Sequence, residues 1–175
     1  MSDVIQNPSW DEFFLRHVYL AATKSKDPSS KLGAVLVKDG IIISEGYNGF
    51  PRGVVDSFER YSNREEKYKY VVHAEANSIL NAARNGISTK GSILYTNGMP
   101  CNECAKSIIQ AGVIEVVIHA GWPMGKLKGI GTGNKKWDDA AKITSNMFGE
   151  CGINVRTVTV KLRLTGLVNG KNVNV

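Results

Sequence analysis

The first apolar positions of the chain recur with the spacing of an amphipathic helix. Over residues 8–21 they fall three or four positions apart, the period that places side chains on one face of a helix. Asp11 and Glu12 stand in the first turn, where acidic residues stabilise the positive end of the helix dipole. Segment 25–30 contains a proline and several serines, and it ends this helix. We expect the helix to cover one face of a sheet with these apolar residues: Trp10, Phe13, Phe14, His17, Val18 and Ala21.

Two short apolar runs follow, 32–37 and 41–44, and they predict a pair of β-strands. Lys38-Asp39-Gly40 between them predicts a hairpin turn, because Asp-Gly tolerates the positive φ angles that tight hairpin turns need. A glycine-rich segment, 46–53, comes directly after the second run. It either lets the backbone approach a ligand closely or forms a simple surface turn, and the pattern favours neither alternative.

Helical and strand patterns alternate through the second half of the chain. Six elements are predicted there: helices over 73–85, 100–112 and 137–150, and strands over 92–96, 116–118 and 153–158. Strands that alternate with helices pair in parallel through right-handed crossovers. The pattern therefore predicts an α/β protein with three α-β-α layers. Its mixed five-stranded sheet has the last three strands parallel and helices on both faces.

Two segments have less distinct patterns. Charges of alternating sign over 54–70 are typical of a solvated face, with room for a short helix. Residues 161–175 are rich in asparagine and glycine, and an extra edge strand, an oligomer contact and a frayed tail all fit them. We therefore expect a single domain over residues 1–160 and a C-terminal extension of unknown role over 161–175.

Composition excludes a membrane protein. Of the 175 residues 42% are hydrophobic, and no apolar run approaches the roughly 20 residues that span a bilayer. Residues 1–6 lack the basic region and apolar stretch of a signal peptide, so we expect a cytoplasmic protein. The net charge of +6 fits nucleic acid or a phosphorylated small molecule as a partner, although composition alone favours a solvated basic surface.

The candidate chemistry lies in two short stretches, 73–75 (His-Ala-Glu) and 100–104 (Pro-Cys-Asn-Glu-Cys). One imidazole and two thiolates are three ligands for a tetrahedral zinc, and the open fourth position is typical of a catalytic site. Water in that position would be acidified toward hydroxide, and Glu75 is placed to move its proton. Both stretches fall where helices should start, and the positive helix end favours thiolates.

A structural zinc site is the main alternative for these residues. It would need a fourth protein ligand, and neither Cys151 nor His119 stands at the spacing of a second ligand pair. We expect Cys151 instead to pack as a small apolar side chain near Phe148 and Ile153. A disulfide framework is not expected from three cysteines of which two belong to the motif.

A His-x-Glu followed by Pro-Cys-x-x-Cys is the signature of zinc-dependent nucleobase deaminases. The chain further resembles the deoxycytidylate (dCMP) deaminases of the cytidine deaminase-like superfamily, in a form similar to phage or bacterial members. The resemblance covers about residues 10–158. It rests on Ser25-Lys26-Asp27-Pro28, Gly33-Ala34-Val35, the Gly-Tyr-Asn-Gly-x-Pro-x-Gly segment at 46–53, and segments 73–77, 100–106 and 109–112. The 46–53 segment is the most specific of these, because the zinc motif alone fits many deaminases.

The resemblance implies the cytidine deaminase-like fold and the hydrolysis of dCMP to dUMP and ammonia, which supplies dUMP for dTMP synthesis. It implies Zn²⁺ bound by His73, Cys101 and Cys104, with Glu75 as the proton shuttle. The implied substrate-binding residues are Ser25 and Lys26 at the phosphate, Asn48 at the sugar, the backbone of Ala74 at the base, and Trp122 near the nucleotide.

The resemblance also implies regulation. Members of the family are typically homohexamers, activated by dCTP with Mg²⁺ and inhibited by dTTP at a site between subunits. Gly49, Arg52, Gly53 and Arg84 are the candidates for that site here. The insert before the His-x-Glu helix lacks the Cys and His residues for the second, structural zinc that some phage members carry.

Three other functions are compatible with parts of the pattern. A tRNA adenosine deaminase shares the zinc motif and would contact RNA phosphates through Lys126, Lys128, Lys135 and Lys136, but it is not expected to carry the 46–53 segment. A free cytidine deaminase usually has cysteine at the zinc histidine. A non-catalytic zinc-stabilised protein would need neither Glu75 nor an open ligand position. The prediction is therefore a dCMP deaminase with no nucleic-acid partner.

Overall fold

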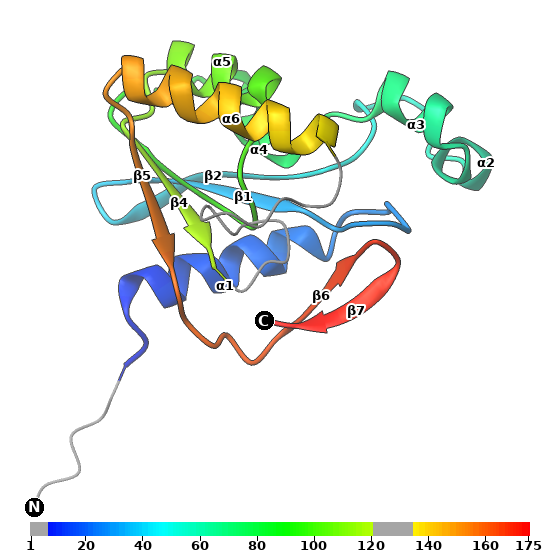
Figure 1. Cartoon of the computed structure of the whole chain (residues 1–175), viewed down its shortest axis with the longest axis horizontal. Helices are drawn as coiled ribbons and strands as arrows, with labels where there is room; N and C mark the ends of the chain where they lie inside the picture. Colours follow the sequence, from blue (N-terminus) through cyan, green and yellow to red (C-terminus); the bar gives the residue numbers. More distant parts are fainter. Residues whose placement is uncertain (1–6, 121–134) are drawn as a thin grey trace, which may run out of the picture.

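The computed structural model describes residues 7–120 and 135–175. A five-stranded sheet forms its centre (Figure 1), in the order β2-β1-β3-β4-β5. The strands are β1 (Gly33–Lys38), β2 (Ile41–Tyr47), β3 (Ile93–Thr96), β4 (Glu115–His119) and β5 (Asn154–Val158). Strand β1 is antiparallel to both of its neighbours, whereas β3, β4 and β5 are parallel. The predicted mixed sheet with three final parallel strands is confirmed.

Helices cover both faces of this sheet. Helix α1 (Trp10–Ala22) lies on one face, and α4 (Ala74–Arg84), α5 (Asn102–Gln110) and α6 (Lys135–Glu150) lie on the other (Figure 1). Alternate residues of a strand point to opposite faces, so β1 contributes to both cores. Val35 packs in the core on the α1 side, and Leu36 packs in the core with α4 and α5. Two short helices, α2 (Phe58–Ser62) and α3 (Arg64–Tyr70), lie at one end of the molecule.

The buried face of α1 differs in part from the predicted one. Phe14 is buried as predicted, but Trp10 is 69% exposed and Phe13 is 38% exposed. Leu15 and Tyr19 are buried instead. Leu15 and Tyr19 are four positions apart and therefore lie on one side of the helix. The side of α1 that faces the sheet is thus turned about the helix axis, by about one residue, from the side that the apolar spacing predicted.

Residues with positive φ angles form the turn after β1 and the turn after α6. Asp39 and Gly40 have φ angles of 52° and 75°, so the β1–β2 hairpin has the predicted turn. At the end of α6, Gly152 has a φ of 69° and the Ile153 N–H donates to the carbonyl of Phe148 at 2.9 Å, a Schellman-type end. Cys151 is exposed in this turn, so the prediction that it packs in the core is wrong: Phe148 and Ile153 make the apolar contact there.

Arg156 joins the first helix to the edge of the sheet. From β5 its guanidinium donates two hydrogen bonds to Asp11 on α1, of 2.6 and 3.0 Å, and one of 2.6 Å to Glu115 on β4. Asp11 also accepts a hydrogen bond from the hydroxyl of Tyr95. The bonds from Arg156 hold the pKa of Asp11 below its usual value.

The last residues form a second, two-stranded sheet, β6 (Thr165–Val168) and β7 (Lys171–Asn174), which we call the C-terminal hairpin. It pairs with itself rather than adding an edge strand to the main sheet. Leu162, Val168 and Val175 are buried in the same core as α1. The division of the chain at residue 160 stays a prediction. In the described part of the chain, no helix combines the length and the apolar character that a membrane span requires.

Candidate metal centre and substrate cavity

The two motif stretches open adjacent helices, as the sequence predicts. His73 is the N-cap residue of α4, and Cys101 is the N-cap residue of α5. The Cys101 sulfur accepts a hydrogen bond from the backbone N–H of Cys104 at 3.5 Å, which is the contact an N-cap side chain makes. Helices α4 and α5 pack against each other, so the two N-termini bring the histidine and the cysteines to one place.

The three donor atoms have the spacing that zinc requires. His73 Nδ1 lies 3.4 Å from the sulfur of Cys101 and 3.5 Å from the sulfur of Cys104. A tetrahedral zinc bonds sulfur at about 2.3 Å and nitrogen at about 2.0–2.1 Å, which separates the two donors by about 3.5 Å. The donor set of one imidazole and two thiols therefore fits zinc in both chemistry and distance.

Protonation in this group follows from the contacts among its members. Hydrogen bonding to Cys104 and to His73 lowers the pKa of Cys101, while the neighbouring Cys101 raises the pKa of Cys104. The hydrogen bond with Cys101 raises the pKa of His73 to about 9. A divalent cation would displace these shared protons, because it binds thiolates and a neutral imidazole.

Glu75 lies beside the metal ligands in the first turn of α4. Its side chain is buried, and Oε2 is 3.8 Å from the sulfur of Cys104. Burial raises the pKa of this carboxyl group above its usual value. A carboxyl group with a raised pKa can both accept and donate a proton near neutral pH, as a general acid–base group must.

A cavity of about 350 Å³ opens beside these residues, within the range of small-molecule sites. His73, Glu75 and Cys101 line it. The rest of its lining comes from the 27–32 loop, Asn48, α2, α3 with Val71 after it, the segment 96–99 that leads from β3 toward α5, Ala141 on α6, and Asn169 in the C-terminal hairpin.

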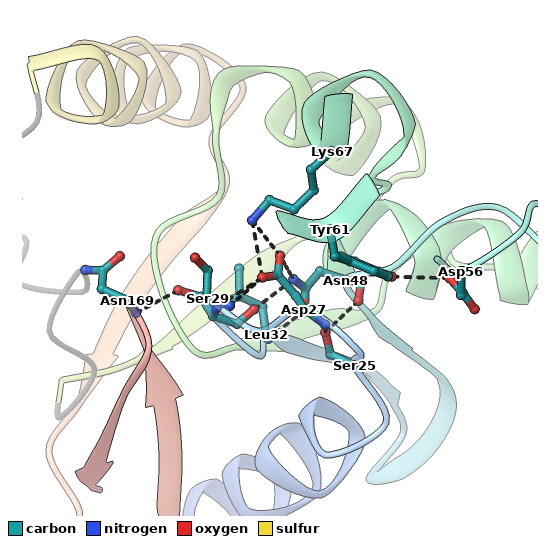
Figure 2. A network of polar contacts seen from close by, with 10 residues as sticks. Ser25, Asp27, Ser29, Leu32, Asn48, Asp56, Tyr61, Lys67 and Asn169 are labelled. Atoms are coloured by element: carbon teal, nitrogen blue, oxygen red, sulfur yellow. Dashed lines mark hydrogen bonds and ion pairs between the residues drawn. The ribbon is translucent and has the colours of Figure 1, made fainter. Parts of the chain in front are cut away.

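A network of hydrogen bonds fixes Asn48 at the cavity wall (Figure 2). Asn48 Oδ1 accepts from the Leu32 N–H at 2.8 Å, and Nδ2 donates to the Ser30 carbonyl at 2.9 Å and to Asp27 at 3.3 Å. Asp27 also accepts from the Ser29 N–H at 2.8 Å, an Asx-type turn that shapes the loop. The amide of Asn48 is therefore held in one orientation.

The other predicted substrate residues lie in different surroundings. The buried Ser25 hydroxyl donates to the backbone carbonyl of Asn48 at 2.8 Å, and the Lys26 ammonium forms an ion pair with the Asp56 carboxylate at 2.7 Å. Neither Ser25 nor Lys26 lines the cavity. Ala74 is fully buried in the first turn of α4. Trp122 lies outside the described residues, as do Lys126 and Lys128, and the substrate roles of all these residues stay predictions.

The four residues proposed for regulation lie around α4. Gly49 exchanges two backbone hydrogen bonds with Val72, the residue before His73. Arg52 donates to the side chain of Asn81 on α4 at 2.6 Å. Gly53 has a φ of 83° in an exposed turn, and Arg84 is exposed in the last turn of α4. None of the four lines the cavity.

Sequence reasoning missed two parts of this site. Lys67 belongs to a segment predicted as a solvated face, and no local pattern signals that its side chain points inward to Asp27. Asn169 comes from the C-terminal extension. The dipeptide Asn169-Gly170, with φ angles of 48° and 71°, is a strong hairpin signal that would have predicted this turn.

Comparison with known proteins agrees with this geometry. A family model described as the cytidine and deoxycytidylate deaminase zinc-binding region matches residues 8–120. The deoxycytidylate deaminase of Mus musculus is 45% identical over 114 residues, and the alignment covers 62% of this chain and 63% of that protein. The chain therefore spans less than two thirds of that relative's length. An uncharacterized deaminase of Aliivibrio fischeri is 34% identical over 146 residues, covering 83% of this chain and 91% of that protein.

A solved structure gives the same result for the fold. The dCMP deaminase of the cyanophage S-TIM5, determined in complex with dCMP and dUMP, superposes with a TM-score of 0.65 at 25% identity. The superposition covers 88% of this chain and all of that one. The predicted cytidine deaminase-like fold is confirmed. Because the family model matches more than half of the chain and includes both metal-motif stretches, the chain belongs to the cytidine and deoxycytidylate deaminase zinc-binding family.

Proposed function

We propose that this protein is a zinc-dependent dCMP deaminase, which hydrolyses dCMP to dUMP and ammonia in the cytoplasm and supplies dUMP for dTMP synthesis. One observation carries the proposal: the His73–Cys101–Cys104 group and the buried Glu75 meet at the wall of a cavity large enough for a small ligand. The similarity to proteins named deoxycytidylate deaminase, and to a phage enzyme solved with dCMP and dUMP, supports the choice of substrate.

Each residue of the centre has a distinct role in this proposal. His73, Cys101 and Cys104 would hold the zinc, which when bound lowers the pKa of a water molecule toward neutrality. Glu75 takes one proton from the attacking water and gives it to the ring nitrogen of the cytosine. It then takes the second proton, from the hydroxyl group now bonded to the ring carbon, and gives it to the leaving amine as the carbonyl forms and ammonia departs. Its burial and raised pKa support this shuttle, because the carboxyl group must alternate between its two protonation states.

The substrate contacts follow from the same cavity. Among the described residues, Asn48 Oδ1 accepts one hydrogen bond, which leaves its second lone pair for a sugar hydroxyl. The backbone of Ala74 would meet the base, and Trp122 would lie near the nucleotide. Ser25 and Lys26 remain the residues that the family resemblance assigns to the phosphate end.

Regulation is a further part of the proposal. We propose a homohexamer that dCTP with Mg²⁺ activates and dTTP inhibits, with Gly49, Arg52, Gly53 and Arg84 in the regulatory site. The hydrogen bonds from Gly49 to Val72 and from Arg52 to α4 support this, because a ligand bound there would act on the helix that begins at His73. Sedimentation with and without the two nucleotides tests the assembly.

Ammonia release from a panel of substrates tests the activity. The zinc-loaded protein should deaminate dCMP in preference to dCTP, cytidine and the adenosine of tRNA, and dCTP and dTTP should shift the dCMP rate in opposite directions. Turnover of cytidine at least as efficient as that of dCMP would contradict recognition of the phosphate. Turnover confined to tRNA adenosine would replace the proposal by the tRNA deaminase alternative.

A further inference from the structure

The C-terminal hairpin reaches the wall of the substrate cavity. Its turn residue Asn169 lines the cavity together with Ser29 and Ser30. Two contacts fix this position: the Asn169 N–H donates to the Ser30 hydroxyl at 3.1 Å (Figure 2), and the Gly170 N–H donates to the Ser29 carbonyl at 2.7 Å. The hairpin is also anchored in the core through buried Val168. The turn is therefore a fixed part of the cavity wall.

The side chains in this part of the lining suit an anion. Ser29, Ser30 and Asn169 offer hydroxyl and amide donors, and α3 adds two cations, Lys67 and Arg64. The charge of Lys67 is offset, because its ammonium contacts both carboxylate oxygens of buried Asp27.

The second cation of α3 keeps its charge available. The Arg64 guanidinium lies 5.6 Å from the centre of the Tyr68 ring and forms no ion pair with any residue in ranges 7–120 and 135–175. One positive charge in the lining of the cavity is therefore left without an ion-pair partner among the described residues. A planar guanidinium with neighbouring hydroxyl and amide donors is a set that binds phosphate.

We propose that Arg64, Ser29, Ser30 and Asn169 bind the 5′-phosphate of the nucleotide substrate, so that the C-terminal hairpin is part of the substrate site. This inference rests on the proposed function. A base placed against Glu75 occupies the metal-bearing wall of the cavity, and the phosphate then meets the polar, cationic part of the lining. The hairpin lies beyond residues 8–120, which the family model matches, so its contribution is inferred from the structure alone.

The proposal also assigns a role to Ser25 and Lys26. Neither lines the cavity, but Ser25 bonds the backbone of Asn48 and Lys26 pairs with Asp56. Both contacts brace the loop that continues into Ser29 and Ser30. They are positioning residues in this scheme, and the phosphate is contacted by the residues that follow them.

Two single variants test the phosphate contacts. Asn169 has a φ of 48°, so Asn169→Gly removes the amide and keeps a backbone conformation that glycine adopts freely. Arg64→Gln removes the charge from an exposed side chain. Asn172→Ala is the matched control, since Asn172 is an exposed asparagine of the same hairpin that does not line the cavity.

The measurement is calorimetric binding of dUMP and of deoxyuridine, which differ only in the phosphate, to the zinc-loaded protein. Asn169→Gly and Arg64→Gln should each weaken dUMP binding by about tenfold or more, the usual value for a charge-assisted hydrogen bond, and leave deoxyuridine binding unchanged. Asn172→Ala should change neither. Unfolding midpoints equal to that of the wild type show that the variants are folded.

The outcomes separate this inference from the proposed function. If the wild type deaminates dCMP and prefers dUMP to deoxyuridine, but both variants bind dUMP as the wild type does, the phosphate lies elsewhere and the inference is overturned. An equal loss of affinity for dUMP and for deoxyuridine in the variants also overturns the inference. A wild-type protein that releases no ammonia from dCMP refutes the proposed function itself.

Discussion

The carboxylate of Asp27 and the ammonium of Lys67 form a buried ion pair at the cavity, with Nζ 3.0 and 3.2 Å from the two oxygens (Figure 2). The two side chains are 5% and 9% exposed. The same carboxylate accepts a hydrogen bond from the Asn48 amide. One ion pair therefore links α3 to the loop that carries Ser29 and Ser30, and it orients a proposed sugar contact.

Removal of one partner of this pair should destabilise the protein strongly. Lys67→Met leaves the charge of Asp27 buried without its partner, which costs about 3–5 kcal/mol in the free energy of unfolding. The double variant Asp27→Asn with Lys67→Met should recover part of that loss, because no charge is left behind. Urea unfolding measures both values.

Lys69→Met is the control for this experiment. Lys69 lies on the same helix, and its ion pair with Glu66 is at the surface with the lysine 69% exposed, so its loss should cost less than about 1 kcal/mol. If Lys67→Met and Lys69→Met lower the free energy of unfolding equally, the buried Asp27–Lys67 ion pair stabilises the protein no more than a surface ion pair does.

Glu75→Gln should slow turnover greatly and leave the metal bound. The variant keeps the shape of the side chain but cannot carry the proton, so the rate of ammonia release from dCMP should fall by roughly 10²–10⁴-fold. Zinc content by atomic absorption should remain that of the wild type. Glu103→Gln, an exposed glutamate of the same motif paired with Lys106, should keep full activity. An active Glu75→Gln enzyme would remove Glu75 from the mechanism.

Substitution of the motif cysteines should remove the metal and its stabilising effect. Cys101→Ser and Cys104→Ser should each lose bound zinc, whereas Cys151→Ser, at an exposed cysteine outside the motif, should retain it. A chelator should lower the melting temperature of the wild type and of Cys151→Ser, because a ligand at 1,000 times its Kd stabilises by about 4 kcal/mol. Full zinc content in Cys101→Ser would contradict the ligand set.

Gly46→Ala should disturb the metal centre from a distance. Gly46 lies in β2 against α4, and a Cβ there would overlap the backbone atoms Ser78 N and Ala74 O. The helix that begins at His73 must then move, so we expect a loss of about 1–3 kcal/mol in stability together with weaker zinc binding. Calorimetry and zinc titration measure the two effects.

Gly149→Ala is the matched control. Gly149 lies in α6, and a Cβ there would meet no atom within 4 Å. Alanine in that helix should leave zinc affinity unchanged and raise stability slightly, since it restricts the unfolded chain. If Gly46→Ala and Gly149→Ala both bind zinc with wild-type affinity, the close contact between Gly46 of β2 and α4 does not determine the position of His73.

The features that a local pattern specifies were predictable from the sequence. The starts of α4 and α5 at His73 and Cys101 followed from the helix patterns, and their closeness followed from the parallel arrangement of the strands between and after them. The β1–β2 turn followed from Asp39-Gly40. For the turn and for each helix start, the residues that determine the structure are within a few positions of one another.

The rest depended on contacts between distant segments. The inward position of Lys67 depends on Asp27, 40 residues earlier in the chain. The place of Asn169 at the cavity depends on Ser30, 139 residues earlier. The exposure of Trp10 depends on which side of α1 the sheet and the C-terminal hairpin cover. Periodicity identifies the helix, but its orientation is set by tertiary packing.

The Arg156–Asp11 contact has a consequence for synthesis of the protein. Asp11 is synthesised 145 residues before its guanidinium partner. Strand β1, which packs on α1, follows the helix closely in the chain, whereas β3, which also packs on α1, is synthesised only after β2 and α4. Helix α1 can therefore dock on β1 early, whereas its contacts with β3 and with Arg156 form only later in synthesis. The core beside α1 should accordingly be complete only once β5 and the C-terminal hairpin have been synthesised.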